Sequence, residues 1–234
     1  MYHSINFGSK NTWDDWHLVP TSRPVFNPPA LKERKLEIPG GNGIIDMTTS
    51  LTGYPVFQNR EGSFEFIVMN DYMEWHELYS EISDYLHGQK MKAWFDFEWN
   101  SNGYYYEGRF KVNSWKSDKN YSKITIDYSV FPYKIGWLSK SMNIPSTVQQ
   151  GSPVAIPGEL IGQMPVCPYL IVHTTSSDPM IINFTNSYLG INYSTMLHAG
   201  SYRIPDIVFY GDDCKFDISG VAGILNIGWF YGRL

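Results

Sequence analysis

The run from Trp13 to His17 holds the side chains best suited to binding a metal ion. Asp14, Asp15 and His17 lie together there, and carboxylate and imidazole groups are common metal ligands. Adjacent side chains of an extended chain point to opposite faces, however, so Asp14 and Asp15 would not converge on one ion. The sequence therefore predicts no metal site and no cofactor.

A second group of residues has the types found in hydrolytic enzymes. His76, Ser80 and Asp84 recur every four residues, which places them along one line of a predicted helix. A nucleophilic serine needs a strained turn and donors for the oxyanion, and this segment suggests neither. Because the three side chains lie opposite the apolar stripe of the helix, they indicate a solvated face. We expect no enzymatic activity.

Two further segments could bind a small ligand. Gly40-Gly41-Asn42-Gly43 lacks the Lys-Ser or Lys-Thr that follows a phosphate-binding loop, so it predicts a sharp turn instead. Trp229 and Tyr231 could form a platform on which a sugar stacks. Such residues more often fill a core or a subunit contact, and the sequence leaves both interpretations open.

The composition limits the classes of partner. The net charge is −5 and Lys and Arg do not cluster, which argues against specific binding of nucleic acid or of an anionic membrane. The sequence contains no run of about 18 apolar residues, so we expect no membrane-spanning helix. Cys167 and Cys214 have no Cys or His partner at zinc-ligand spacing, which indicates reduced, packed thiols.

One helix is expected, over residues 71–87. Asn70 or Asp71 can cap its start, Glu74 adds negative charge to the first turn, and Gly88 can end it. At 100° per residue its large apolar side chains fall on one side, which should pack against a sheet. These side chains are Tyr72, Trp75, Leu78, Tyr79, Ile82, Tyr85 and Leu86.

Alternating apolar and polar residues predict strands on both sides of this helix. Residues 63–69 place Phe64, Phe66 and Val68 on one face, which should be buried. A three-stranded meander should follow the helix, with a hairpin loop at residues 100–103. Its strands are expected at residues 92–99, 104–112 and 124–131. Strand, helix and meander together predict an α+β unit.

The second half of the chain has a different pattern. Its prolines and the polar run at residues 146–152 indicate a junction over residues 134–165, with a domain boundary near Gly136. Short strand-like runs separated by turn signals then predict an antiparallel sandwich without a helix. The runs are at residues 168–173, 180–184, 189–193, 207–210, 216–218 and 224–229.

The first 35 residues mix aromatic, proline and polar residues with no sustained period. Because proline lacks an N–H and disfavours helix at the preceding residue, residues 21–29 should run extended over a surface. That surface can belong to the same domain or to a neighbouring copy, and the sequence leaves both open.

Four segments of the first 135 residues carry a family resemblance. They are FGSKNTWDDW at residues 7–16, IPGGNGIID at residues 38–46, NREGSFEF at residues 59–66 and PYK at residues 132–134. Their order and spacing resemble those of the distal tail proteins (Dit) of long-tailed bacteriophages. The chain is similar to the compact members, without the long inserted arm or added carbohydrate-binding module of larger relatives.

The resemblance implies a mainly β fold: a tail-tube-like split β-barrel with one helix over residues 1–135, then a galectin-like antiparallel β-sandwich over residues 136–234. It also implies a homohexameric hub at the distal end of the tail tube, assembled in the host bacterial cytoplasm. Its partners would be the tail tube protein and a tail-tip or tail-associated protein, with a receptor-binding protein as a further candidate. The alternative is a module that binds bacterial surface glycans through the sandwich.

A ring needs a head-to-tail interface, and an extended arm or loop laid on a neighbour can supply it. For residues 37–46 we favour such an intersubunit contact. Arg60 beside Glu61 is consistent with a surface ion pair and with an interface contact, and the resemblance favours the second. The candidate interface residues are Trp13, Trp16, Arg23, Pro24, Ile38, Pro39, Gly40, Gly41 and Arg60.

Overall fold

The computed structural model of the protein describes residues 3–69, 73–96, 103–117, 121–146 and 152–234. It divides into two compact units. Unit 1 consists of residues 1–32 and 56–135, and unit 2 consists of residues 33–55 and 136–234. Antiparallel strands dominate the described elements, so the predicted mainly β fold is confirmed.

Unit 1 is built around one curved antiparallel sheet, whose strands follow the order β2-β1-β7-β8-β9-β6-β3. The predicted meander is β7, β8 and β9, with a bulge between Val112 and Ser114. Part of its predicted hairpin loop, residues 100–102, lies outside the described residues. The strands are β1 (Ser4–Phe7), β2 (Lys10–Asn11), β3 (Leu18–Pro20), β6 (Arg60–Val68), β7 (Lys90–Asp96), β8 (Tyr104–Ser117) and β9 (Ser122–Val130).

The two ends of this sheet are tied together through Thr12, which is fully buried. The Thr12 backbone N–H donates to the carbonyl of Ile5 in β1, and the Thr12 carbonyl accepts from the N–H of Leu18 in β3. The Thr12 hydroxyl also accepts from the Ile5 N–H, at 2.9 Å. These bonds close the sheet toward a barrel and satisfy backbone groups that a sheet edge would leave unpaired.

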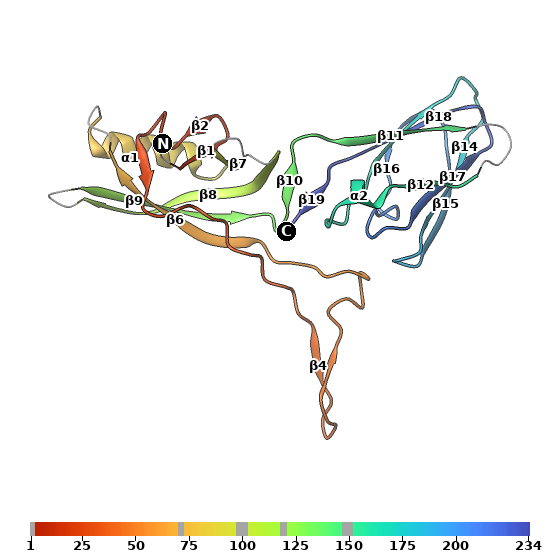
Figure 1. Ribbon diagram of the computed structural model, residues 1–234, viewed down its shortest axis with the longest axis horizontal. Helices are drawn as coiled ribbons and strands as arrows, with labels where there is room; N and C mark the ends of the chain where they lie inside the picture. The colour runs from red at the N-terminus through yellow and green to blue at the C-terminus, as the bar shows by residue number, and fades with distance from the viewer. Residues whose placement is uncertain (1–2, 70–72, 97–102, 118–120, 147–151) are drawn as a thin grey trace. The chain divides into compact units, whose positions relative to one another are not determined.

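The predicted helix is α1 (Trp75–Leu86), which lies along one face of the sheet of unit 1 (Figure 1). Leu78, Ile82 and Leu86 are buried against the sheet, as predicted. The proposed caps at residues 70 and 71 lie outside the described residues, while Gly88 follows the helix with φ of 79°. Within the described ranges, no helix is long and apolar enough to cross a membrane.

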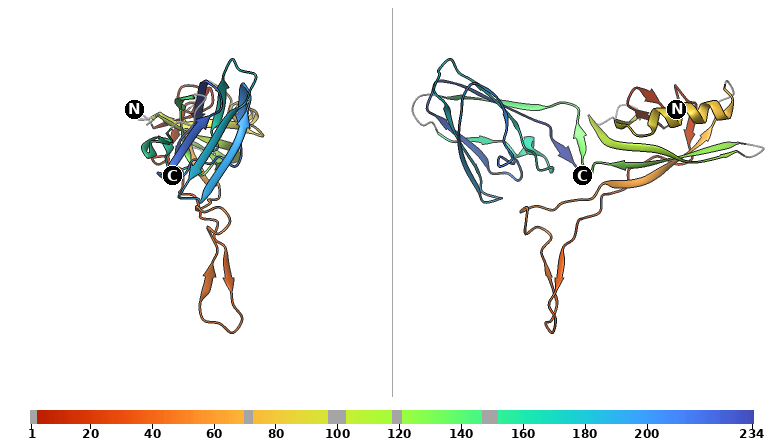
Figure 2. Two further views of the ribbon diagram at one scale, coloured as in Figure 1. Left: turned by 90° about the vertical axis from the view of Figure 1, so that its right-hand side faces the viewer. Right: turned by 180° about the vertical axis from the view of Figure 1, so that it is seen from behind.

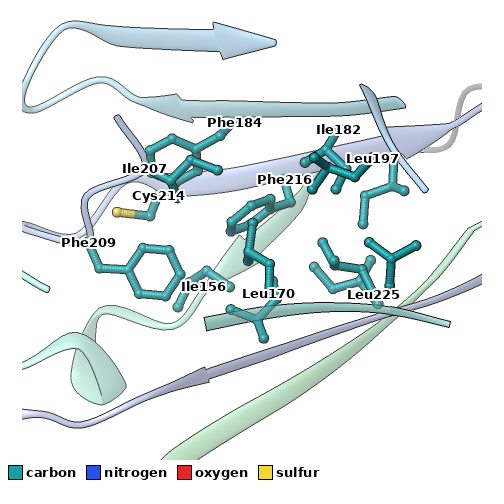
Figure 3. Packing of buried hydrophobic residues seen from close by; sticks show 14 of the residues in the cluster. Ile156, Leu170, Ile182, Phe184, Leu197, Ile207, Phe209, Cys214, Phe216 and Leu225 are labelled. Carbon is teal, nitrogen blue, oxygen red and sulfur yellow. The ribbon is translucent and has the colours of Figure 1, made fainter. Parts of the chain in front are cut away.

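Unit 2 contains a sandwich of two four-stranded sheets, with orders β11-β18-β13-β16 and β12-β17-β14-β15. Alternate side chains of both sheets point inward and pack together around Phe184, Phe209 and Phe216 (Figure 3). The strands are β11 (Lys140–Ser146), β12 (Val154–Ile156), β13 (Tyr169–His173), β14 (Met180–Asn186), β15 (Ile191–Leu197), β16 (Gly200–Arg203), β17 (Cys214–Ser219) and β18 (Gly223–Trp229).

The expected junction at residues 134–165 is wrong at β11 and β12, which belong to the two sheets of the sandwich. Pro145 occupies an edge strand, where a missing N–H is tolerated. The short helix α2 (Gly158–Ile161) was also not expected. β10 (Lys134–Gly136) spans the boundary of the units in the sequence, and β19 (Gly232–Arg233) precedes the C-terminus.

The remaining strands of unit 2 are β4 (Lys35–Glu37) and β5 (Ile44–Asp46), which pair as an antiparallel hairpin. Figure 2 shows these two strands side by side. Every residue from 31 to 47 is exposed.

Candidate assembly interface

The β4–β5 hairpin has one apolar face that is open to solvent. Leu36 lies directly opposite Ile45, and the Met47 N–H donates to the Arg34 carbonyl in the same ladder. Because side chains alternate along a strand, Leu36, Ile38, Ile45 and Met47 share this side, which we call the hydrophobic hairpin face. Their side chains are between 39% and 53% exposed. An isolated two-stranded hairpin is marginally stable in water, and exposed apolar faces are typical of interaction surfaces.

The tip of the hairpin is the predicted turn. The Gly41 N–H donates to the Ile38 carbonyl at 3.0 Å, and Gly40 and Gly43 have φ of 76° and 84°. Positive φ at these positions favours glycine because it lacks a Cβ. The candidate interface residues Ile38, Pro39, Gly40 and Gly41 are all exposed here. Their contact with a neighbour stays a prediction.

The root of the hairpin is fixed to the sandwich by aromatic contacts within unit 2. The Tyr54 ring lies 5.1 Å from that of Tyr210, which in turn lies 5.4 Å from that of Tyr188. Burial raises the pKa of Tyr210, and the two neighbouring tyrosines add to this shift. The Leu189 side chain lies close to Gly53, since a Cβ added to Gly53 would be only 3.0 Å from Leu189 Cδ2. The root is therefore anchored, while the two strands beyond it are exposed.

Arg60 is buried inside unit 1, where its guanidinium bonds to two other segments of the chain. It is 5% exposed, its Nε donates to the Pro132 carbonyl at 2.7 Å, and its Nη1 donates to the Asn27 carbonyl at 3.0 Å. Burial lowers the pKa of the guanidinium, and nearby tyrosines partly offset this effect. Arg60 thus holds segments at residues 27 and 132 against β6. Neither a surface pair with Glu61 nor a side-chain contact with a neighbour fits this position, which corrects both sequence interpretations.

The two tryptophans of the arm differ in environment. Trp16 is fully buried in the core of unit 1, where its ring lies 5.7 Å from Tyr85 and its indole N–H donates to Glu81. Its side chain cannot lie in a subunit interface, so that prediction is wrong. Trp13 is half-buried beside His17. An interface role for Trp13 stays a prediction.

Residues 21–29 run extended, as predicted, and pack on their own unit. The Thr21 N–H donates to the Glu65 carbonyl, and the Asn27 N–H donates to the Tyr128 hydroxyl at 2.9 Å. Pro24 is buried, which removes it from the candidate interface. Arg23 is exposed and remains a candidate.

A cluster of aromatic residues at the start of α1 was not predicted as a surface feature. The Trp75 ring lies 6.0 Å and the Tyr79 ring 5.6 Å from Trp115 of β8. Trp75 is 52% exposed and Tyr79 is 37% exposed, so the expectation that the whole helix stripe is buried is wrong at its start. These two positions meet the sheet at Trp115, and their rings stay open to solvent. We call Trp75, Tyr79 and Trp115 the aromatic patch.

The acidic segment of the arm stabilises a turn. Asp15 accepts hydrogen bonds from the Asn11 N–H at 2.7 Å and from the Lys10 ammonium at 3.0 Å. Burial alone would raise the pKa of Asp15, but these bonds outweigh it and hold the pKa below its usual value. His17 has φ of 51°.

Among the described residues no group of three His, Cys, Asp or Glu side chains is placed to hold a metal ion.

The polar line of α1 shows no hydrolytic geometry among the described side chains. The Ser80 hydroxyl donates to the His76 carbonyl of the preceding turn, at 2.8 Å. This is a common bond for serine inside a helix, and it occupies the hydroxyl. Asp84 is exposed.

The outer face of the unit 1 sheet carries a cavity of about 670 Å³, but its chemistry is mixed. Glu61, Arg109, Lys111 and Asp127 line it from three neighbouring strands. Arg109 donates to the Gly88 carbonyl at the cavity wall. Because acidic and basic side chains alternate, the cavity favours neither an anion nor a cation.

Of the two interpretations left open for Trp229, a sugar platform is wrong and a place in the core is correct. This residue is 1% exposed, its indole N–H donates to the Leu160 carbonyl at 2.9 Å, and its ring packs on Phe209. Tyr231 is half-buried, with the Lys140 ammonium 5.1 Å from its ring centre. The pair is not an open stacking surface.

Comparisons with known proteins include a strong likeness to a solved structure. No protein-family model and no curated protein matches the chain. The crystal structure of SPP1 Dit (gp 19.1), described as a paradigm of the hub adsorption apparatus in phages that infect Gram-positive bacteria, covers 98% of this chain and 99% of its own, with a TM-score of 0.62 and 14% identity. The chain has the Dit fold. This likeness confirms the fold that the sequence resemblance implied.

A chain of the phage P2 baseplate in its activated conformation with Ca shows a weaker likeness. It covers 97% of this chain and 98% of its own, with a TM-score of 0.36 and 9% identity. The Dit fold of the present chain therefore rests on SPP1 Dit, which extends over both units.

Proposed function

We propose that the protein is the structural hub at the distal end of a phage tail tube, where six copies form a ring. The observation that carries this proposal is the likeness to SPP1 Dit over nearly the full length of both chains. In this role the hub links the tail tube to the tail-tip or baseplate apparatus that recognises the host. Fold alone does not determine function, so the exposed surfaces must also fit the role.

The hairpin supports self-association. A ring of identical copies needs two different patches that meet head to tail, since an interface that pairs a patch with itself stops at a dimer. The hydrophobic hairpin face is exposed, anchored at its root and distinct from both hydrophobic cores. Within the candidate list, Arg23 and the turn residues Ile38, Pro39, Gly40 and Gly41 retain the exposure that an interface requires.

The proposed partners follow from the position in the tail. The tail tube protein would contact one rim of the ring, and a tail-tip or tail-associated protein would contact the other. A receptor-binding protein is a further candidate partner. The place of the protein is then the tip of the virion tail, after assembly in the cytoplasm of the host. We propose a structural role without catalysis and without specific binding of nucleic acid.

Negative-stain electron microscopy of the purified full-length chain tests this proposal. The hub predicts six-lobed annuli with an open centre. Separate particles at micromolar concentration, with no annuli over a range of salt concentrations, would contradict it. A glycan array with the same chain addresses the alternative function, because strong glycan binding by single copies would favour the carbohydrate-binding module.

A further inference from the structure

We propose that Asn42, at the tip of the β4–β5 hairpin, is a site of spontaneous covalent modification. The side-chain amide of Asn42 is converted to a carboxylate without an enzyme, and the reaction consumes only water. The product has an aspartate or an isoaspartate at this position. The inference goes beyond the hub role and does not depend on it, because it follows from the chemistry of one exposed turn.

The sequence supplies both reacting groups at neighbouring positions. Asn42 is followed directly by Gly43, and glycine lacks the Cβ that would crowd its own backbone nitrogen. That nitrogen is the nucleophile, and the Asn42 amide carbon is the group that it attacks. Asparagine is one of the thermally labile residues of proteins, and a glycine after it gives the attacking nitrogen the freest approach.

The structure leaves both groups open to reaction. Asn42 is exposed, and its side chain makes no hydrogen bond to any described residue. The backbone N–H of Gly43 also has no hydrogen-bond partner in the ranges that the structure describes. Gly43 has φ of 84°, and nothing lies within 4 Å of the position that a Cβ would occupy. The Asn42 amide can therefore rotate toward the Gly43 nitrogen without breaking a contact.

The reaction has two steps. A base removes the proton of the Gly43 nitrogen, which then bonds to Asn42 Cγ, while the Cγ–Nδ2 bond breaks and Nδ2 leaves as ammonia. The five-membered succinimide that results is opened by water. Attack of water on Cγ restores the ordinary main chain and gives aspartate, whereas attack on the main-chain carbonyl carbon of Asn42 gives isoaspartate. In sum, one amide and one water give one carboxylic acid and one ammonia.

Two other asparagines show what prevents this reaction elsewhere in the chain. Asn186 is fully buried, and its Nδ2 donates to the carbonyls of Val208 and Tyr210, at 3.0 Å each. Asn113 lies within β8, where its Nδ2 donates to Asp127 at 3.0 Å. Both amides are held in place by hydrogen bonds, and neither asparagine precedes a glycine. Asn42 has neither restraint.

The modification changes the charge of the hairpin tip. Residues 38–43 contain no ionisable side chain. An aspartate carboxyl has a usual pKa of about 3.9, so the product is ionised at neutral pH. Each converted chain thus carries one negative charge beyond the −5 of the sequence, and isoaspartate also lengthens the main chain of the tip by one carbon. The charge of the exposed hairpin therefore changes with the age of the protein.

Incubation of the full-length protein at mildly alkaline pH tests the inference. Ion-exchange chromatography should show a growing species shifted by one negative charge, which elutes with the variant Asn42→Asp. It should form more slowly at mildly acidic pH, because the attacking nitrogen must lose its proton. Tryptic peptides locate the change: Asn42 lies in residues 36–60, and the other Asn-Gly pair lies in residues 93–109, with Asn102 outside the described residues.

An isoaspartate-specific methyltransferase gives an independent readout, since it should label the peptide of residues 36–60. The matched variant is Asn42→Gln, which keeps the amide but would need a six-membered ring to react, and such a ring closes far more slowly. This variant should lose the label in residues 36–60. Within the same sample, the peptides that contain Asn113 and Asn186 should stay unmodified.

A synthetic peptide of residues 36–60 serves as the unfolded reference. The native chain should convert at Asn42 at a rate comparable to that of the peptide. A native chain that keeps an intact Asn42 while the peptide converts would overturn the inference, because the folded turn would then protect the amide. Unchanged labelling of residues 36–60 in Asn42→Gln would overturn it as well. Neither result bears on the hub proposal, which depends on the annuli.

Discussion

The N-terminal arm and the hairpin that follows it look alike in sequence but have opposite environments. Both are extended, and both contain proline and large apolar residues. In residues 3–32, Ile5, Phe7, Trp16 and Phe26 are buried in the core of unit 1, whereas residues 35–47 are exposed throughout. The two segments differ in what they bond to: backbone hydrogen bonds of Thr12 and Thr21 hold the arm against the sheet of unit 1. An extended aromatic segment therefore packs into the core of its own unit when its backbone groups find hydrogen-bond partners there.

The largest difference between the two regions should appear on removing Trp16. Replacing it with alanine leaves a cavity in the core of unit 1 and should lower the free energy of unfolding by about 3 to 5 kcal/mol. Chemical denaturation monitored by far-UV circular dichroism measures this loss. Trp13→Ala is the control, since Trp13 is half-buried. A loss of stability as large as that of Trp16→Ala would contradict the different burial of the two tryptophans.

Arg60→Met should have the next largest effect on stability. The change removes two donors and leaves the carbonyls of Asn27 and Pro132 without them, which should cost about 1 to 3 kcal/mol of unfolding free energy. Thermal unfolding of the full chain measures it. A variant with unchanged stability but impaired assembly would instead place Arg60 at a subunit contact.

The hairpin should respond in the opposite way. Leu36→Ser should change the free energy of unfolding by less than about 0.5 kcal/mol, because the side chain is already exposed. Its effect should appear in sedimentation velocity as a smaller assembly. If Leu36→Ser destabilises the single copy as strongly as a core substitution, the hairpin packs on its own chain.

The smallest expected effect is a dependence of stability on pH in the arm. Hydrogen bonds lower the folded-state pKa of Asp15 below its usual value of 3.8. Its contribution to stability is therefore complete above about pH 4 and is lost as the pH falls through the folded-state pKa. Urea denaturation between about pH 5 and pH 2 should show a weaker pH dependence for Asp15→Asn than for the unmodified protein. Equal pH dependence of the two proteins would mean that the Asp15 bonds do not persist in solution.

The regular parts of the fold could be predicted from sequence because their side chains follow a period. Alternation at Phe64 and Phe66 predicted β6, and the spacing of Leu78, Ile82 and Leu86 predicted the buried side of α1. Pro145 suggested a junction, but the structure has the edge strand β11 there. An edge strand tolerates proline, and the sequence alone does not reveal which strands lie at an edge. Tertiary position thus overrides local composition.

The candidate site was harder to predict, since exposure depends on contacts distant in the sequence. Trp75 and Tyr79 belong to the apolar stripe of the helix, yet their contact with Trp115 leaves them more than a third exposed. Trp16 and Arg60 resembled interface residues and are buried. The alternation of Leu36 and Ile38 is visible in the sequence. It could have predicted a strand here with one apolar side.

Native mass spectrometry of the full-length chain at micromolar concentration tests the central claim most directly. The account predicts a dominant species of six chains, about 161 kDa from six times 26.9 kDa. A spectrum dominated by the single chain at every concentration and ionic strength would contradict it.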